Sequence, residues 1–283
     1  MTKIPYCDET WNVTAGCTKC SPGCLNCWAE KWAHRLGCMG QPFYDMVQDE
    51  GRWNGIIELN KFILDQPLHW RKPRRIFICS MSDLFHPEVP FEFIDKVFIQ
   101  LYRLRRHTFL ILTKRPDRML DYLDDDKWCL RILKSFKNWT PELRLTGRIP
   151  MPNVQLGVSI SNQVEADEKI PTLLQIPAAV RWLSIEPMLE DIDLTGFKPW
   201  YGTFKENQQD KGLQWVVVGC ESLGRKAGRF QDGFIEAARS LVGQCQVANV
   251  PVYVKQIPIN GKVSRNPKEW PKDLRIQQLA KKR

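Results

Sequence analysis

The sequence contains no apolar run near the ~20 residues that span a bilayer, which excludes a membrane-spanning protein. Its first residues, from Met1 to Cys7, lack the apolar core and the small-residue cleavage site of a secretory signal. We therefore expect a cytoplasmic protein, in a bacterium or in a virus-infected cell. A Walker loop, a G-x-S-x-G elbow and a dinucleotide glycine fingerprint are also absent, so nucleotide hydrolysis and esterase chemistry have no positive support.

Histidine is scarce, with four residues, whereas cysteine is abundant, with ten. In a chain of 283 residues without an export signal, cysteines indicate metal or redox chemistry more often than disulfides. Four of the ten fall within eleven residues, between Cys17 and Cys27, and this segment is the leading candidate for a metal site. The others are scattered, and we expect most of them to be small buried hydrophobes: Cys7, Cys38, Cys79, Cys129, Cys220 and Cys245.

The overall composition is that of a soluble globular protein, with 43% hydrophobic and 26% charged residues. The net charge of +9 is compatible with a polyanionic partner such as DNA or RNA, although many basic proteins bind neither. No internal repeat or low-complexity tract interrupts the chain. Charge alone therefore leaves the partner open.

Short apolar, β-branched runs alternate with segments of helical spacing, which predicts repeated βα units. The predicted strands cover residues 9–13, 75–79, 108–112, 154–158, 180–183, 213–219 and 250–254, and the clearest helices cover 90–104 and 232–242. Six or seven such units favour a partial (β/α) TIM-like barrel of parallel strands, with an open doubly wound sheet as the alternative. We expect one barrel over residues 1–261, rim insertions near 124–152 and 196–212, and a basic C-terminal tail over 262–283.

The spacing of Cys20, Cys24 and Cys27 is C-x3-C-x2-C, the signature of radical S-adenosylmethionine (radical SAM) enzymes. Three thiolates on one tight loop can hold three irons of a [4Fe-4S] cluster and leave the fourth iron open for SAM. Pro22 and Gly23 supply a turn that lets the sulfurs converge. The spacing therefore predicts an iron–sulfur site.

Three other interpretations of these cysteines compete with the first. A structural zinc site is one, although paired C-x-x-C knuckles are normally separated by a dozen or more residues and only three lie between Cys20 and Cys24. A fully coordinated electron-transfer cluster is another, and unrelated thiols are the third. The zinc alternative would make the protein a nucleic-acid or protein interaction module without catalysis.

The segment over residues 10–30 resembles the opening of the phage-associated three-Cys-motif family, which is related to radical SAM proteins and to spore photoproduct lyase. Further matching segments follow in order along the chain, at residues 80–86, 112–116, 157–159, 184–187, 219–222 and 255–256. In that family the ligands correspond to Cys17, Cys24 and Cys27, while position 20 is usually apolar. Spacing thus favours Cys20 as the third ligand and the resemblance favours Cys17, which is the one we expect.

The resemblance implies a [4Fe-4S] cluster, SAM as co-substrate and a phage-infected or bacterial cell as the setting. A reductant such as flavodoxin or ferredoxin is implied as a partner. Basic charge, 11 tryptophans and the kinship to spore photoproduct lyase point to a nucleic-acid base as substrate, because aromatic side chains can stack an extruded base.

Polar residues follow the predicted strands, where a parallel barrel gathers its catalytic and binding groups. After the second strand, Ser80, Ser82 and Asp83 are placed to meet the amino group of SAM, although Asp83 can equally cap the following turn. After the third strand, Thr113 and Lys114, with Arg115 beside them, suit the SAM carboxylate or a substrate phosphate. A solvated basic loop is the alternative there.

The later strands predict a second group of site residues. Ser159 is expected to meet the SAM ribose, and Glu186 to bind ribose or orient substrate, because a carboxylate directly after an apolar strand needs a partner or a function. Gly219 would let the backbone approach a ligand, and Glu221 is a pocket carboxylate. Residues 224–229 suit phosphates or form an exposed loop, and Lys255 and Gln256 end the last strand. The predicted catalytic residues are Lys114, Glu186 and Glu221.

Overall fold

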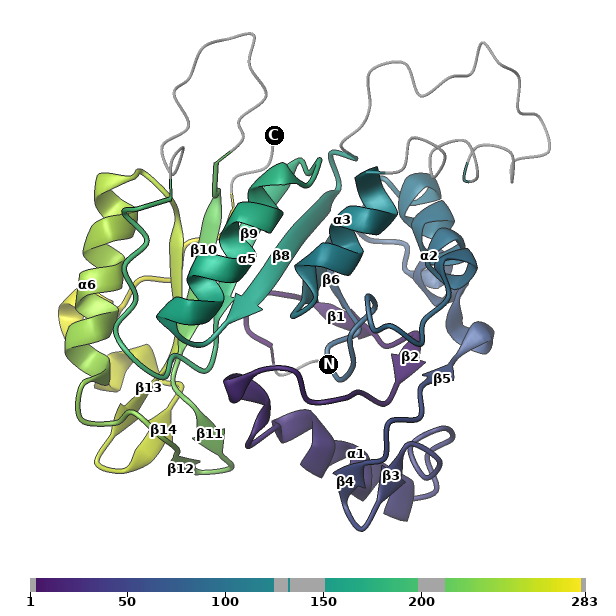
Figure 1. Ribbon diagram of the computed structural model, residues 1–283, viewed down its shortest axis with the longest axis horizontal. Coiled ribbons are helices and arrows are strands. Elements are labelled where there is room, and N and C mark those ends of the chain that lie inside the picture. The colour runs from purple at the N-terminus through teal and green to yellow at the C-terminus, as the bar shows by residue number, and fades with distance from the viewer. Residues whose placement is uncertain (1–3, 125–131, 133–150, 198–211, 281–283) are drawn as a thin grey trace, which may run out of the picture. The chain divides into compact units, whose positions relative to one another are not determined.

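A computed structural model (Figure 1) describes residues 4–124, 132, 151–197 and 212–280. The chain divides into two compact units. Unit 1 comprises Met1–Thr18, Ala29–Leu156 and Ile176–Ala179, and unit 2 comprises Lys19–Trp28, Gly157–Gln175 and Val180–Arg283. The predicted rim insertions lie largely outside the described residues. The boundary between Thr18 and Lys19 runs through the cysteine segment, so its two ends are described with different units.

The main sheet is mixed and mostly parallel, with the order β1-β6-β7-β8-β9-β10-β13-β14-β12-β11. Its first seven strands in that order are β1 (Glu9–Trp11), β6 (Arg75–Ile78), β7 (Thr108–Thr113), β8 (Val154–Ile160), β9 (Val180–Ile185), β10 (Trp215–Gly219) and β13 (Val252–Ile259). From β1 to β13 the order never reverses, whereas a doubly wound sheet requires a reversal. The predicted α/β class is confirmed, and the order is consistent with a partial TIM-like barrel.

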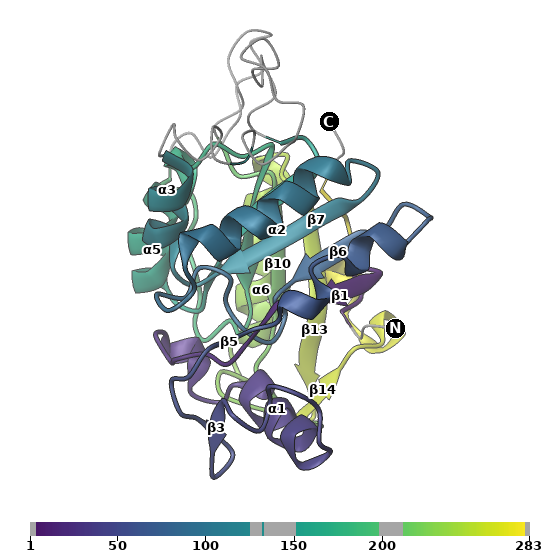
Figure 2. The same cartoon turned by 90° about the vertical axis from the view of Figure 1, so that its right-hand side faces the viewer.

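In unit 1, the strands are nearly continuous apolar runs because both of their faces are covered. Residues Phe109, Leu110 and Ile111 of β7 are fully buried, and β6 pairs with β7 in parallel (Figure 2). Helix α2 (Phe91–Arg103) begins after Pro90, and its buried residues recur every three or four positions. The unit also contains α3 (Pro116–Asp124), most of α1 (Trp28–Cys38) and two small antiparallel pairs, β2 (Thr14–Ala15) with β5 (Glu58–Leu59) and β3 (Gln48–Asp49) with β4 (Arg52–Trp53).

In unit 2, β10 pairs in parallel with β9 on one side and with β13 on the other. Helices α5 (Gln163–Gln175) and α6 (Phe234–Val247) belong to this unit, and α6 lies beside β13 (Figure 1). The rings of Trp182 and Trp215 pack 5.0 Å apart between centroids on neighbouring strands, which buries two of the largest side chains together. Three short strands continue the sheet beyond β13: β14 (Lys262–Ser264), β12 (Lys226–Ala227) and β11 (Ser222–Leu223).

The segment predicted as a basic tail is part of the structure of unit 2. Strand β14 pairs antiparallel with β13, and Gln277 forms a further antiparallel bridge with Tyr253. Trp270 and Leu274 are buried, and the indole of Trp270 donates a hydrogen bond to Ser264 Oγ at 3.0 Å. These apolar anchors, spaced through a polar segment, explain why it packs. Within the described ranges, no helix is long and apolar enough to cross a bilayer.

Gly157 in β8 packs against the indole of Trp182, and this contact leaves no room for a side chain. A Cβ atom at Gly157 would lie 2.4 Å from Cε2 of Trp182, well inside van der Waals contact. By contrast, a Cβ atom at Gly243 in α6 would meet nothing within 4 Å. Gly157 and Gly243 therefore make a matched pair for substitution.

We predict that Gly157→Ala lowers the free energy of unfolding by about 1–3 kcal/mol, because the fully buried Trp182 has to move. Gly243→Ala should raise it by up to about 1 kcal/mol, because alanine favours a helix interior. Urea denaturation followed by circular dichroism measures both. Equal stability of Gly157→Ala and the wild type would contradict the packing described for β8 and β9.

Candidate functional site

The cysteine segment follows β1 and β2 and runs through a short 3-10 turn, Pro22–Cys24, into α1. Ser21 caps the turn, because its Oγ accepts a hydrogen bond from the Gly23 N–H at 3.1 Å. The predicted turn at Pro22 and Gly23 is thus confirmed. Of the four thiols, that of Cys24 is buried, those of Cys17 and Cys27 are half-buried, and that of Cys20 is exposed.

Thiolates are the donors that iron–sulfur clusters use, so four thiols in eleven residues fit such a cluster by their chemistry. Among the residues that the structure describes, no three His, Cys, Asp or Glu side chains are grouped around a common metal position. Cluster binding would therefore require the cysteine side chains to turn toward one centre.

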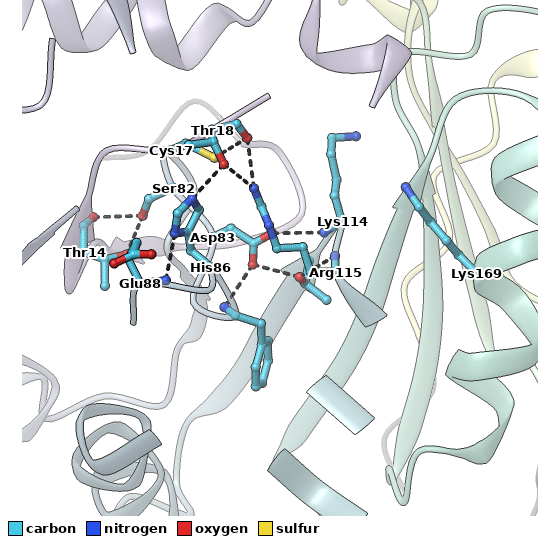
Figure 3. A network of polar contacts seen from close by, with 12 residues as sticks. Thr14, Cys17, Thr18, Ser82, Asp83, His86, Glu88, Lys114, Arg115 and Lys169 are labelled. Atoms are coloured by element: carbon cyan, nitrogen blue, oxygen red, sulfur yellow. Dashed lines mark hydrogen bonds and ion pairs between the residues drawn. The ribbon is translucent and has the colours of Figure 1, made fainter. Parts of the chain in front are cut away.

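Asp83 is the centre of a polar network in unit 1 that extends to Thr18, the residue after Cys17 (Figure 3). It lies in the loop after β6 and is 6% exposed. Its carboxylate accepts hydrogen bonds from Thr113 Oγ1 at 2.8 Å, the Lys114 N–H at 3.1 Å, the Phe85 N–H at 3.0 Å and Arg115 Nη1 at 3.0 Å. Four donors match the acceptor capacity of a carboxylate. Asp83 therefore joins its own loop after β6 to the residues at the end of β7.

Arg115 connects this carboxylate to the residue that follows Cys17. Its Nη2 donates to the carbonyl oxygen and to Oγ1 of Thr18, both at 2.9 Å. Nε2 of His86 lies 2.8 Å from the same Oγ1 (Figure 3). The Asp83–Arg115 ion pair, with side chains 7% and 12% exposed, therefore fastens the chain at Thr18.

The proton of His86 can be placed from its contacts. Nδ1 accepts a hydrogen bond from the Glu88 N–H at 3.2 Å, so a neutral ring carries its proton on Nε2 and donates it to Thr18 Oγ1. Burial lowers the pKa of His86, and the positive charge of Arg115 lowers it further. The neutral form of His86 is thus the one that supports Thr18.

Ser80 and Ser82, predicted near the SAM amino group, contact the chain that leads from β1 into the cysteine segment. The Ser80 hydroxyl and N–H both donate to Oδ1 of Asn12, at 3.1 and 2.9 Å. The Ser82 hydroxyl donates to the carbonyl oxygen of Thr14 at 2.8 Å. The loop after β6 thereby fixes the segment on the N-terminal side of Cys17.

A second carboxylate–arginine pair fastens the cysteine segment within unit 2. Glu221 is 4% exposed and accepts hydrogen bonds from the backbone N–H and the guanidinium of Arg229 and from Nδ2 of Asn26. Nη2 of Arg229 also donates to the Pro22 carbonyl oxygen at 3.0 Å. Glu221 and Arg229 thus hold the segment at two points, on either side of Cys24.

The surroundings of Glu221 favour its ionised form and leave no space beside it. Burial alone would raise the pKa of Glu221, but the hydrogen bonds from Arg229 and Asn26 outweigh it and keep the pKa below its ordinary value. A Cβ atom at Gly228 would lie 2.2 Å from Oε2 of Glu221, so the close approach requires glycine. Glu221 is therefore a buried, fully bonded carboxylate.

The segment over residues 224–229, predicted to wrap a phosphate or to form an exposed loop, contains the turn after β11, strand β12 and the two residues that follow it. Arg225 and Lys226 are exposed. The Arg229 guanidinium is bound to Glu221 and to the Pro22 carbonyl oxygen. One of the three cations predicted for a phosphate is therefore engaged inside unit 2, and both interpretations of the segment stay predictions.

Glu165 of α5 is another buried carboxylate in unit 2, and it was not predicted as a site residue. It accepts hydrogen bonds from the N–H and hydroxyl of Ser161 and from Lys169 Nζ. Burial opposes ionisation, yet hydrogen bonds from Lys169, Ser161 and Ser21 lower the pKa of Glu165. Ser21, the cap of the cysteine turn, is thus tied to α5 as well.

Glu186 follows β9 directly, as predicted, and forms an ion pair with Lys255 Nζ. Lys255 and Gln256 lie inside β13 and do not end it, because the strand continues to Ile259. The register between β10 and β13 shifts there: Val218 pairs with Val254 and Gly219 with Gln256. Lys255 is the extra residue of this β-bulge, a device that re-aims side chains.

The remaining predicted residues are placed as follows. Ser159 was expected after its strand but lies inside β8 and is buried, because the strand runs to Ile160. Gly219 ends β10, and a Cβ atom there would lie 3.3 Å from Cγ of both Glu186 and Gln256. Lys114 is half-buried after β7. Within unit 2, Gly219 therefore allows Glu186 and Gln256 to approach the strand end.

Three residues of the candidate site were not predicted from the sequence: Thr18, Asn26 and Asn12. Their partners are Arg115, Glu221 and Ser80, which lie 97, 195 and 68 residues away in the chain. Each is a short polar residue in a loop, a pattern that is too common to indicate a long-range contact. Only their position beside the cysteines or β1 offered a signal.

We predict that Asp83→Asn lowers the free energy of unfolding by about 3 kcal/mol, because it leaves the buried guanidinium of Arg115 without a counter-charge. Asp121→Asn, the same change at an exposed position of α3, should alter it by less than about 0.5 kcal/mol. Urea denaturation of the metal-free protein measures both. Similar stabilities of the two variants would contradict the role of the Asp83 network.

We predict that the stability of the protein falls as the pH drops from about 7 toward 5, with a contribution from His86. The unfolded state binds a proton near the ordinary histidine pKa of 6.5, whereas the folded state does so only at lower pH. His86→Gln should weaken the slope of unfolding free energy against pH in this window, and His69→Gln, at an exposed position, should leave it unchanged. Identical slopes for His86→Gln and the wild type would argue against a buried neutral imidazole.

The chain was compared with known families, curated proteins and solved structures. It matches the model of the family described as "Protein of unknown function (DUF5131)" over residues 1–278. No curated protein matches it, and no solved structure does. The match spans nearly the whole chain, including both units and the cysteine segment. The chain therefore belongs to the DUF5131 family.

Proposed function

We propose that this protein is a radical SAM enzyme that binds a [4Fe-4S] cluster through its cysteine segment. The observation that carries the proposal is the C-x3-C-x2-C spacing of Cys20, Cys24 and Cys27, with Cys17 just before it, in a loop that follows the first strand of the parallel sheet. Two buried carboxylates, each paired with an arginine, fasten this loop, which supports a role that needs a fixed geometry.

Cys24, Cys27 and Cys17 are the proposed cluster ligands. When bound, the cluster supplies one electron that cleaves SAM reductively and starts the abstraction of a hydrogen atom from substrate. Cys17 is half-buried and Cys20 is exposed. This difference supports Cys17 as the third ligand, because the surroundings of a metal site control the access of solvent to it. Its neighbour Thr18 is also fastened by Arg115, whereas Cys20 is exposed.

Residues at or near the carboxyl ends of the strands of each unit are proposed to bind SAM. Ser80, Ser82, Thr113 and Lys114 belong to unit 1, and Ser159, Glu186 and Gly219 belong to unit 2. The four donors to Asp83 and the bonds to Glu221 support a positioning role for these two carboxylates, in place of the direct ligand contact predicted for them. Lys114 and Glu186 remain the proposed catalytic residues.

The proposed substrate is a nucleic-acid base, in DNA or RNA, and the proposed electron donor is a flavodoxin or ferredoxin. The net charge of +9 supports a polyanionic substrate, and the tryptophan content supports base stacking. A cytoplasmic setting in a bacterium or a phage-infected cell belongs to the same proposal.

We predict that anaerobically purified protein contains iron and sulfide and cleaves SAM when dithionite is added. Cys24→Ala and Cys27→Ala should each abolish iron binding, because two remaining thiolates are too few to hold the cluster. Cys17→Ala should do the same, and Cys20→Ala should retain the iron. Iron and sulfide content per chain, visible absorbance and the release of methionine from SAM measure these outcomes.

Cys38→Ala is the control, because Cys38 is an exposed cysteine at the end of α1 that should leave the iron content unchanged. Iron loss in Cys20→Ala with retention in Cys17→Ala would transfer the third ligand to Cys20. A colourless protein that contains zinc and does not cleave SAM would refute the enzyme and favour a zinc-binding interaction module.

A further inference from the structure

Helix α1 exposes two tryptophans on one face, whereas Ala29, Glu30 and Ala33 on another face are buried. Trp28 is 52% and Trp32 is 43% exposed, and they lie four residues apart, one turn along the helix. No other tryptophan in the described residues is that exposed, and four of them are almost fully buried: Trp11, Trp182, Trp215 and Trp270. Two large aromatic rings in water on one helix face indicate an interaction surface.

The charges on this face of α1 are all positive. Lys31 and Arg35, also four residues apart, lie beside the tryptophans and are exposed. The Arg35 guanidinium carbon lies 5.9 Å from the centre of the Trp32 ring, within reach of a cation–π interaction. We name the four residues Trp28, Lys31, Trp32 and Arg35 the aromatic–basic face.

No carboxylate opposes these cations within α1. Glu30 is the helix's acidic residue, and it is buried at 6% exposure. Its Oε1 accepts a hydrogen bond from the Trp53 N–H at 3.0 Å, on the side of the helix that also buries Ala29 and Ala33. The helix thus keeps its negative charge inside and presents aromatic rings and cations to solvent.

We propose that the aromatic–basic face binds single-stranded nucleic acid. Successive bases stack on exposed aromatic rings, while lysine and arginine neutralise the backbone phosphates. Leu25 and Met39 are exposed aliphatic residues just outside the two ends of α1, whereas the face itself presents only rings and cations. A lipid surface would favour aliphatic residues among the tryptophans, and a typical protein interface would have a charge-poor centre. Trp28 directly follows Cys27, so the surface continues from the proposed cluster loop.

This inference rests on the proposed function for its substrate class and adds the surface that receives the strand. The test measures fluorescence anisotropy of labelled oligothymidylate and oligouridylate with the full-length protein, over a series of salt concentrations. Trp32→Ala and Trp28→Ala should each weaken binding about tenfold, through lost stacking. Lys31→Gln and Arg35→Gln should each reduce the slope of log affinity against log salt by about 0.7, the value for one phosphate contact on a single strand.

Phe62→Ala and Lys61→Gln are matched controls, because they remove an aromatic ring and a cation that are exposed in unit 1 but lie outside α1. Both should bind like the wild type. Binding that is unchanged in Trp28→Ala and Trp32→Ala, or equally reduced in Phe62→Ala, would overturn the proposal. Equal affinity for a duplex of the same length would overturn it as well, and so would binding to phosphatidylserine vesicles without binding to the oligonucleotides.

The binding assay and the SAM assay separate the two proposals. Tryptophan-dependent oligonucleotide binding by a protein that neither binds iron nor cleaves SAM would support the surface and refute the enzyme. SAM cleavage by a protein that binds no oligonucleotide would do the reverse.

Discussion

The pairing of a buried carboxylate with an arginine is the interaction on which the cysteine segment depends. Asp83 holds Arg115, which binds Thr18, and Glu221 holds Arg229, which binds Pro22. The segment has little apolar surface of its own, and of its four cysteines only Cys24 is buried. Packing alone would therefore fix it poorly, and directional charge-assisted hydrogen bonds take over that role.

The chemistry of arginine explains why both pairs use it. A guanidinium has five N–H donors in a plane, so one edge can bind the carboxylate while another donor reaches a backbone carbonyl oxygen. Arg115 does this with Nη1 on Asp83 and Nη2 on Thr18, and Arg229 binds both Glu221 and Pro22. Lysine presents a single ammonium group and could not span both partners in one fixed geometry. Such pairs add little net stability over apolar packing, so we attribute to them the definition of one loop conformation.

The strands were predictable because their signal is local. A run such as Phe109, Leu110 and Ile111 is apolar in every residue, and a strand covered on both faces imposes that pattern. Strand ends were less predictable: β8 and β13 run further than expected, so Ser159, Lys255 and Gln256 lie within strands. The bulge at Lys255 results from the register of two strands, and no single strand's sequence contains that information.

The candidate site was predictable in its residue types but not in its pairings. Asp83 and Glu221 stood out as carboxylates after apolar strands, yet the sequence could not show whether they face a ligand or a neighbouring loop. The answer depended on Asn26 and Arg229 for Glu221 and on Arg115 for Asp83. A carboxylate with a ligand role and one with a positioning role look the same in sequence, because both need only a polar residue at a strand end.

Helices α1 and α2 distribute their large and small residues in opposite ways, and only α1 departs from the usual pattern. In α2 the large side chains Phe93 and Phe98 face the core, as apolar burial requires. In α1 the core side is occupied by Ala29 and Ala33, and the tryptophans face solvent. Small residues on the core side let α1 lie close to its neighbours, and the beginning of α1 is set by the loop that Glu221 and Arg229 fasten. Trp28, the first residue of α1, lies two residues after Asn26, which Glu221 binds within unit 2.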